Sequence, residues 1–103
     1  MLAVLLESEG FEVQTASNGA EALAAMYATR PAVILLDLMM PVMSGDEFRR
    51  RQLAEPEYAG VPVICMTAAH DGSQRAQKLR ATQYFQKPVN FDDLITAVRQ
   101  LTS

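Results

Sequence analysis

The sequence contains one cysteine, one histidine and no tryptophan among its 103 residues. The single cysteine, Cys65, cannot form a disulfide within the chain, and Cys65 with His70 supplies too few ligands for a zinc site. An excess of positive charge is also absent, because nine Lys and Arg stand against twelve Asp and Glu for a net charge of −3. The composition therefore argues against a disulfide scaffold, a zinc protein and a surface for nucleic acid or anionic lipid.

Long hydrophobic runs are missing as well. The apolar start, residues 1–6, is too short to span a membrane and has no basic flank or cleavage site of a signal peptide. Half of the residues are hydrophobic and a fifth are charged, which is typical of a soluble globular protein. We expect residues 1–103 to form one cytoplasmic domain with no membrane contact and no effector domain.

The chain does contain a regular alternation of helix and strand patterns. Strands are predicted at residues 11–15, 32–36, 61–66 and 82–85, and helices at 1–9, 21–28, 47–54, 73–80 and 91–101. Gly10 gives a helix stop, and three helix starts carry a capping residue three positions before an acid: Asn18 with Glu21, Ser44 with Glu47, and Asn90 with Asp93. Strands that are apolar throughout and alternate with helices indicate a parallel sheet covered on both faces, so the fold class is α/β.

Polar residues follow three of these strands. Asp37 ends the run Val-Ile-Leu-Leu at 33–36, Thr67 ends the strand 61–66, and Lys87 comes two residues after the strand 82–85. Right-handed crossovers point parallel strands the same way, so a carboxylate, a hydroxyl and an ammonium are expected at one edge of the sheet. Each residue alone could simply end a strand, cap a loop or form a surface ion pair. Together they fit a carboxylate nucleophile that forms an acyl phosphate, with Thr67 and Lys87 binding the phosphoryl oxygens beside a divalent metal.

The segments VILLDLMMPVMSG, VPVICMTA and YFQKP resemble the receiver domain of two-component response regulators, and GFEVQTASNGAEAL resembles the stretch between that family's first and second helices. The resemblance implies a flavodoxin-like (CheY-like) doubly wound fold with Asp37 as phosphoacceptor, Thr67 as switch hydroxyl and Lys87 as the conserved-type lysine before a cis proline bond. It also implies that Tyr84 is a switch aromatic. The amide of Ala68 would bind the phosphoryl group, and the carbonyl of Met39 would bind Mg²⁺.

Two departures from the family pattern are visible. Arg80 stands where the family usually has glycine before the last strand. In addition, the family's first strand, which is central in the sheet and ends in an acidic pair that holds Mg²⁺, has no counterpart, because the chain opens inside what resembles the first helix. We therefore expect four strands and about five helices, weak or absent Mg²⁺ binding and impaired phosphorylation.

The gap left by that strand would expose the edges of residues 11–15 and 32–36. Unpaired edges invite association, so a homodimer formed by swapping a strand or segment is the favoured prediction, with internal rearrangement as the alternative. The expected partners are a sensor histidine kinase or phosphotransfer protein and a downstream protein bound by the last two helices and last strand. A separate expectation is that Arg49, Arg50 and Arg51 form a solvated helix face.

The leading function is thus a signalling module, not an enzyme. A haloacid-dehalogenase-like aspartyl-phosphate phosphatase also uses an aspartate after an apolar strand, but it needs a second acid where this chain has Met39. A flavodoxin-like flavin-binding domain is a third reading, although the loop that would hold the flavin phosphate is absent.

Overall fold

The computed structural model describes residues 2–38, 45–68 and 72–102. The helices in these ranges are α1 (Leu2–Ser8), α2 (Gly19–Ala28), α3 (Gly45–Ala54), α4 (Gly72–Lys78) and α5 (Phe91–Thr102), and the strands are β1 (Ile34–Asp37), β2 (Val63–Thr67) and β3 (Gln83–Gln86). None of these helices is long and apolar enough to cross a membrane.

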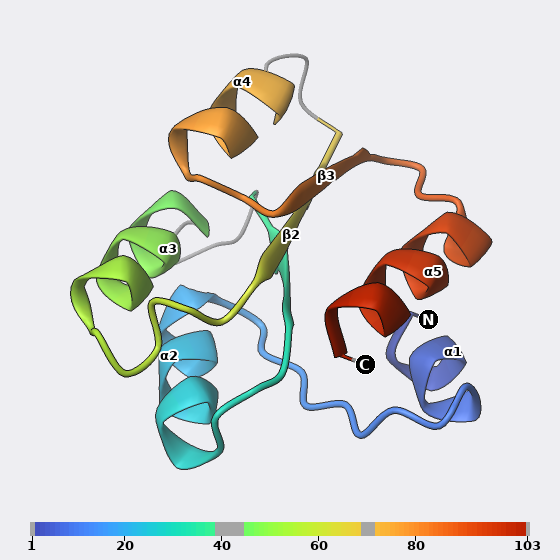
Figure 1. The fold of residues 1–103 in the computed structure, drawn as a ribbon, viewed down its shortest axis with the longest axis horizontal. Helices are drawn as coiled ribbons and strands as arrows, with labels where there is room; N and C mark the ends of the chain where they lie inside the picture. The colour runs from blue at the N-terminus through green and yellow to red at the C-terminus, as the bar shows by residue number, and fades with distance from the viewer. Residues whose placement is uncertain (1, 39–44, 69–71, 103) are drawn as a thin grey trace.

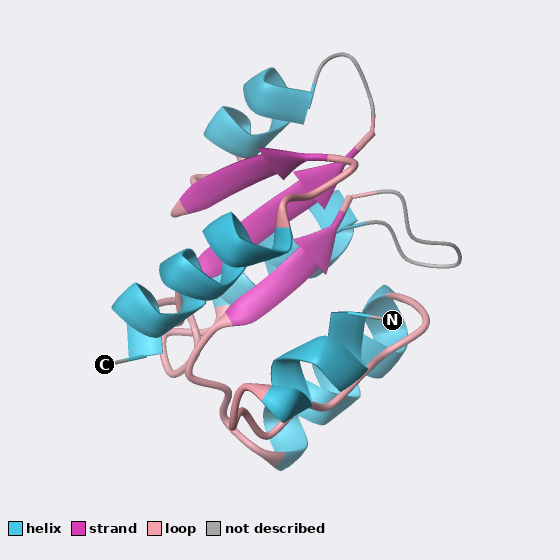
Figure 2. Cartoon of the chain, turned by 90° about the vertical axis from the view of Figure 1, so that its right-hand side faces the viewer, coloured by secondary structure: helices cyan, strands magenta, loops and turns pink. Residues whose placement is uncertain are grey.

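The three strands form one parallel sheet in the order β1-β2-β3. Figure 1 shows α1 and α5 on one side of the sheet and α2, α3 and α4 on the other, and Figure 2 shows the three strand arrows pointing the same way. The predicted α/β class with a parallel, doubly covered sheet is confirmed. The consequence for function is that the carboxyl ends of all three strands lie at one edge.

The predicted strand at residues 11–15 is wrong. These residues have no strand conformation and lead from α1 into α2, so the described part of the chain has three strands instead of the expected four. A strand needs a hydrogen-bonded neighbour, and in the described residues β1 pairs with β2 alone. The alternation in Phe-Glu-Val-Gln-Thr is therefore a burial pattern without a ladder: Phe11 and Val13 are half-buried and Glu12 and Gln14 are exposed.

The helix boundaries follow the predicted signals closely. Asn18 caps α2 by accepting a hydrogen bond from the Glu21 amide at 2.9 Å, and Asn90 caps α5 by accepting from the Asp93 amide at 3.1 Å. After α1, Gly10 adopts a φ of +94°, the left-handed conformation that ends many helices. The predicted cap at Ser44 lies outside the described residues.

Alternate residues of the sheet supply two hydrophobic clusters, one on each face. Leu36, Val63 and Cys65 pack with residues of α2, α3 and α4 on one face, including Met26 and Phe48. On the other face Ile64 packs with Leu94, Ala97 and Val98 of α5. All five residues of β2 are buried, so the central strand of the described sheet is covered on both faces.

Arg49 contradicts the predicted solvated arginine face. Arg50 and Arg51 are exposed and bond to Glu47, but the Arg49 side chain is buried and 4 % exposed. Its guanidinium donates to the carbonyls of Leu79 (2.8 Å) and Arg80 (2.9 Å), which follow α4, and to Oε1 of Gln52 (2.7 Å). Burial lowers the pKa of the Arg49 guanidinium, and its donors are satisfied by two backbone carbonyls and one side-chain amide oxygen. Arg49 thus joins α3 to the end of α4.

Candidate functional site

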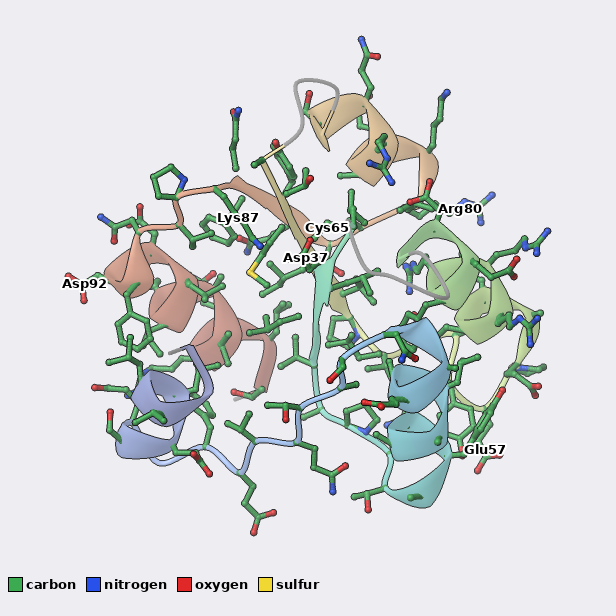
Figure 3. All side chains as sticks on the ribbon, turned by 180° about the vertical axis from the view of Figure 1, so that it is seen from behind. Asp37, Glu57, Cys65, Arg80, Lys87 and Asp92 are labelled. Carbon is green, nitrogen blue, oxygen red and sulfur yellow. The ribbon has the colours of Figure 1, made fainter. Side chains whose placement is uncertain are left out.

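Asp37 and Lys87 meet at the carboxyl edge of the sheet. Lys87 Nζ lies 2.5 Å from Asp37 Oδ2, and the two side chains are 43 % and 33 % exposed (Figure 3). An ion pair this open to solvent contributes about 0–1 kcal/mol to folding. Stability therefore gives little reason to place a carboxylate at the end of this half-buried strand, whereas reactivity toward a ligand in solution does.

Thr67 ends β2, the strand between those that lead to Asp37 and Lys87. The carbonyl of Thr67 accepts a hydrogen bond from the Lys87 amide at 2.9 Å, which fixes the start of the loop that carries the lysine. The peptide bond between Lys87 and Pro88 is cis, as the resemblance predicted. The Thr67 side chain itself is fully buried, on the face of Val63 and Cys65, so the three predicted residues adjoin while only Asp37 and Lys87 are open to solvent.

Tyr84 lies on β3 beside Cys65 of β2 and packs against the cluster on the α2, α3 and α4 face. Its ring points inward to the first residue of α4, Gly72, which also adjoins the Thr67 methyl. The tyrosine and threonine that the resemblance pairs as a switch are thus brought to the same glycine.

An open pocket adjoins the Asp37–Lys87 pair. It is lined by Asp37, Met66, Ala68, Lys87, Pro88 and Val89. Ala68, whose amide the resemblance assigns to the phosphoryl group, is exposed and lines this pocket. Met39, predicted to offer a carbonyl to Mg²⁺, lies outside the described residues.

Sequence reasoning missed a second set of contacts beside Asp37. Arg75 of α4 donates to Asp46 Oδ1 at 2.6 Å and to the carbonyl of Leu38 at 3.4 Å. At the first residue of α3, a Cβ on Gly45 would lie 3.0 Å from the Asp37 carbonyl. The two contacts of Arg75 join residues 29 and 37 positions apart, so no local pattern in the sequence predicts them.

Among the described residues no group of three or more His, Cys, Asp or Glu side chains is arranged to hold a metal ion. Mg²⁺ is usually bound through one or two carboxylates together with phosphate oxygens and waters. Asp37 is one such carboxylate, and Lys87 already contacts its Oδ2. Among the residues predicted to hold Mg²⁺, Asp37 is thus the one whose position the structure describes.

The neighbouring thiol is not part of this chemistry. Cys65 is fully buried, and burial raises its pKa to about 11, so the thiol is neutral at physiological pH. The prediction that Cys65 behaves as a small buried hydrophobe agrees with this environment.

The family profile described as "Response regulator receiver domain" matches residues 1–99 of the chain. The chain belongs to the receiver domain family. It is 37 % identical over 98 residues to the phosphate regulon transcriptional regulatory protein PhoB of Rhizobium meliloti. This match covers 93 % of this chain and 43 % of PhoB. This receiver chain therefore spans less than half the length of that relative.

Solved receiver structures agree with the fold. The receiver domain of a histidine kinase from Syntrophus aciditrophicus superimposes with a TM-score of 0.89 at 30 % identity, covering 98 % of this chain and 78 % of that one. The chemotaxis protein CheY4 of Vibrio cholerae gives a TM-score of 0.86 at 32 % identity, with 98 % and 86 % covered. The fold is CheY-like, and the chain is a receiver domain of two-component signalling, a family of signalling modules. The dehalogenase-like and flavin-binding readings are set aside by this membership.

Proposed function

We propose that Asp37 of this receiver domain accepts a phosphoryl group from a histidine kinase or phosphotransfer protein. The observation that supports the proposal is the 2.5 Å contact between Lys87 Nζ and an Asp37 carboxylate that is one-third exposed. A solvent-accessible carboxylate beside an ammonium provides both a nucleophilic oxygen and a cation for the incoming phosphoryl oxygens.

The transfer requires one bond to form and one to break. An Asp37 carboxylate oxygen attacks phosphorus, the phosphorus bond to the donor imidazole nitrogen or acyl oxygen breaks, and the electron pair leaves with the donor. Lys87 moves from the carboxylate to a phosphoryl oxygen, and the amide of Ala68 donates to another. Thr67 contributes its hydroxyl when its side chain turns from the buried face toward the phosphoryl group. The product is an acyl phosphate on Asp37, and the domain turns over no substrate of its own.

We propose that Mg²⁺-dependent labelling of this chain is impaired, because no group of three or more His, Cys, Asp or Glu side chains in the described residues is arranged to hold the ion. The module then acts chiefly by binding a downstream protein through α4, β3 and α5, in the cytoplasm. It also forms a homodimer through the edge of β1, which has no paired strand among the described residues.

The test is incubation with acetyl phosphate, with and without Mg²⁺, followed by mass spectrometry of the intact chain and its peptides. We expect a weak adduct on Asp37 in the wild type and none in Asp37→Asn, which keeps the size of the side chain. Labelling of Asp37→Asn to the wild-type level would refute the phosphoacceptor role. Strong Mg²⁺-dependent labelling of Asp37 would refute only the proposed impairment.

A further inference from the structure

We propose that Gly72 is a positioning residue for the Tyr84–Thr67 pair: the missing side chain at the start of α4 is the space that the Tyr84 hydroxyl occupies. The residue at position 72 then decides whether Tyr84 can lie inward over Thr67. The link from Tyr84 to phosphorylation rests on the proposed function. The contacts among Gly72, Tyr84 and Thr67 do not depend on it.

The space at Gly72 is closed on two sides. A Cβ built there would lie 2.5 Å from Thr67 Cγ2 and 2.9 Å from Tyr84 Cε1, and it would be closer still to the Tyr84 hydroxyl oxygen. Carbon atoms in contact lie about 3.5–4.0 Å apart, so all three distances are clashes. A methyl group therefore cannot be added at position 72 without moving Tyr84, Thr67 or the helix.

The backbone does not explain this glycine. Among the described glycines Gly10 alone has a positive φ, so the conformation at Gly72 is one that an L-residue adopts without strain. Gly60 provides the contrast, because a Cβ there meets nothing within 4 Å and its φ is also ordinary. Lack of space thus distinguishes Gly72 from Gly60, and it is more severe at Gly72 than at Gly45, where the nearest atom lies 3.0 Å from a built Cβ.

Tyr84 is the group that can give way. Thr67 is fully buried at the end of β2, and its backbone pairs with Gln86 of β3, so its side chain has little room in which to move away from position 72. Tyr84 is half-buried on β3, an edge strand of the described sheet, and its hydroxyl is the far end of a side chain with two rotatable bonds. A methyl at position 72 should therefore turn the ring out toward solvent.

Position 72 then biases a two-state side chain without touching the phosphoryl group. Tyr84 has an inward and an outward conformation. A side chain at position 72 that clashes with the inward ring lowers the ratio of inward to outward Tyr84 by the energy of that clash. If Thr67 must move toward a phosphoryl group while Tyr84 occupies the space beside it, filling that space weakens binding of the phosphoryl analogue.

The first measurement is nitration of the three tyrosines by tetranitromethane, followed by peptide mass spectrometry. In Gly72→Ala we expect Tyr84 nitration to rise about tenfold, the change in a two-state ratio produced by about 1.4 kcal/mol. Tyr27 and Tyr58 serve as internal standards, and Gly60→Ala is the matched control expected to leave Tyr84 unchanged. Equal Tyr84 nitration in Gly72→Ala, Gly60→Ala and the wild type would overturn the inference.

Double variants separate positioning from a general role of Gly72 in folding. Removing the ring with Tyr84→Ala, or the methyl with Thr67→Ser, should restore much of the thermal stability that Gly72→Ala loses. These variants also keep the question answerable if Gly72→Ala alone fails to fold. A loss of the same size in the Tyr84→Ala background would assign Gly72 a role independent of Tyr84 and contradict the inference.

Beryllofluoride titration connects this arrangement to the proposed function. Where the wild type binds the analogue, Gly72→Ala should weaken binding about tenfold, and this difference should vanish in the Tyr84→Ala background. A wild type that binds no analogue would overturn the phosphoacceptor proposal while the nitration result still decides the role of Gly72. Unchanged affinity in a Gly72→Ala variant with raised Tyr84 nitration would overturn the coupling to phosphorylation.

Discussion

Arg80 occupies the turn between α4 and β3 with a φ of +56° (labelled in Figure 3). The left-handed region costs a residue with a Cβ about 1–2 kcal/mol, and glycine loses about 0.5–1 kcal/mol more backbone entropy on folding. We predict that Arg80→Gly stabilises the domain by about 0.5–1 kcal/mol, because the carbonyl that accepts from Arg49 is kept. Urea unfolding measures this.

Arg80→Ala is the control for that prediction. Alanine removes the charge and the long side chain but keeps the Cβ, so the strained conformation remains. If the alanine variant gains as much stability as the glycine variant, the Arg80 guanidinium and not the backbone conformation destabilises the wild type.

Cys65 gives a prediction about alkaline pH. Its pKa is raised to about 11 by burial, above the value in an unfolded chain, so the folded state holds the thiol proton more tightly. The stability associated with this proton is complete below the unfolded pKa and is lost as pH rises through 11, about 3 kcal/mol in all for two pKa units at about 1.4 kcal/mol each. Compared with Cys65→Ala, the wild type should lose more stability between pH 8 and pH 11 in denaturant titrations at each pH.

The same thiol supplies an independent measurement. A neutral, fully buried Cys65 should react with iodoacetamide only when the domain opens, so native and unfolded protein should differ strongly in the rate of alkylation. Rapid alkylation of the native protein would contradict the burial on which the pH prediction rests.

At the scale of elements, Arg49 joins α3 to the end of α4. Replacing it with methionine removes the donors to two buried or half-buried carbonyls and to Gln52, each of which costs about 1–3 kcal/mol when left without a partner. We predict that Arg49→Met lowers the free energy of unfolding by about 2–4 kcal/mol. Thermal and urea unfolding measure the loss.

Arg50→Met is the matched control, since Arg50 is exposed and pairs with Glu47 on its own helix. We expect that variant to lie within about 0.5 kcal/mol of the wild type. Similar losses in the two variants would show that the buried position of Arg49 is unimportant.

Elements were predictable where the signal is local. Asn18 and Asn90 bond amides three residues on, and Gly10 ends its own helix, so the sequence near each boundary contains both partners. The strand at residues 11–15 failed because a strand depends on a neighbour that alternation cannot reveal. Arg49 failed for the same reason: Glu47 lies nearby in the sequence, whereas the carbonyls that bind Arg49 lie about thirty residues away.

The candidate site likewise has features that the sequence predicts and features that it does not. The convergence of Asp37, Thr67 and Lys87 at one edge could be predicted because parallel strands with helical crossovers fix where their ends lie, and the contact of Asp37 with Lys87 follows from that topology. The burial of Thr67, the approach of Gly72 to Tyr84 and the bonds of Arg75 depend on how α4 docks on the sheet. No local sequence pattern predicts how a helix docks on a sheet at the level of single side-chain contacts.

At the scale of the whole molecule, the sheet is asymmetric in the described residues. β2 is paired on both edges, whereas β1 has a strand on one edge only. If dimerisation satisfies that edge, the melting temperature should rise with protein concentration by mass action. Light scattering coupled to gel filtration should then give twice the 11.3 kDa chain mass. A monomer that unfolds cooperatively at every concentration would contradict the dimer.

The position of β2 also determines how the domain responds to deuterated solvent. Its five residues are buried and its amides lie between two partner strands, so they belong to the part that opens only in global unfolding. Thr67, the last of the five, pairs with Gln86 of β3 and ends the segment that we expect to exchange most slowly. If modification of Asp37 changes the environment of Thr67, the exchange rate of the Thr67 amide should change while the rates of the other β2 amides stay the same.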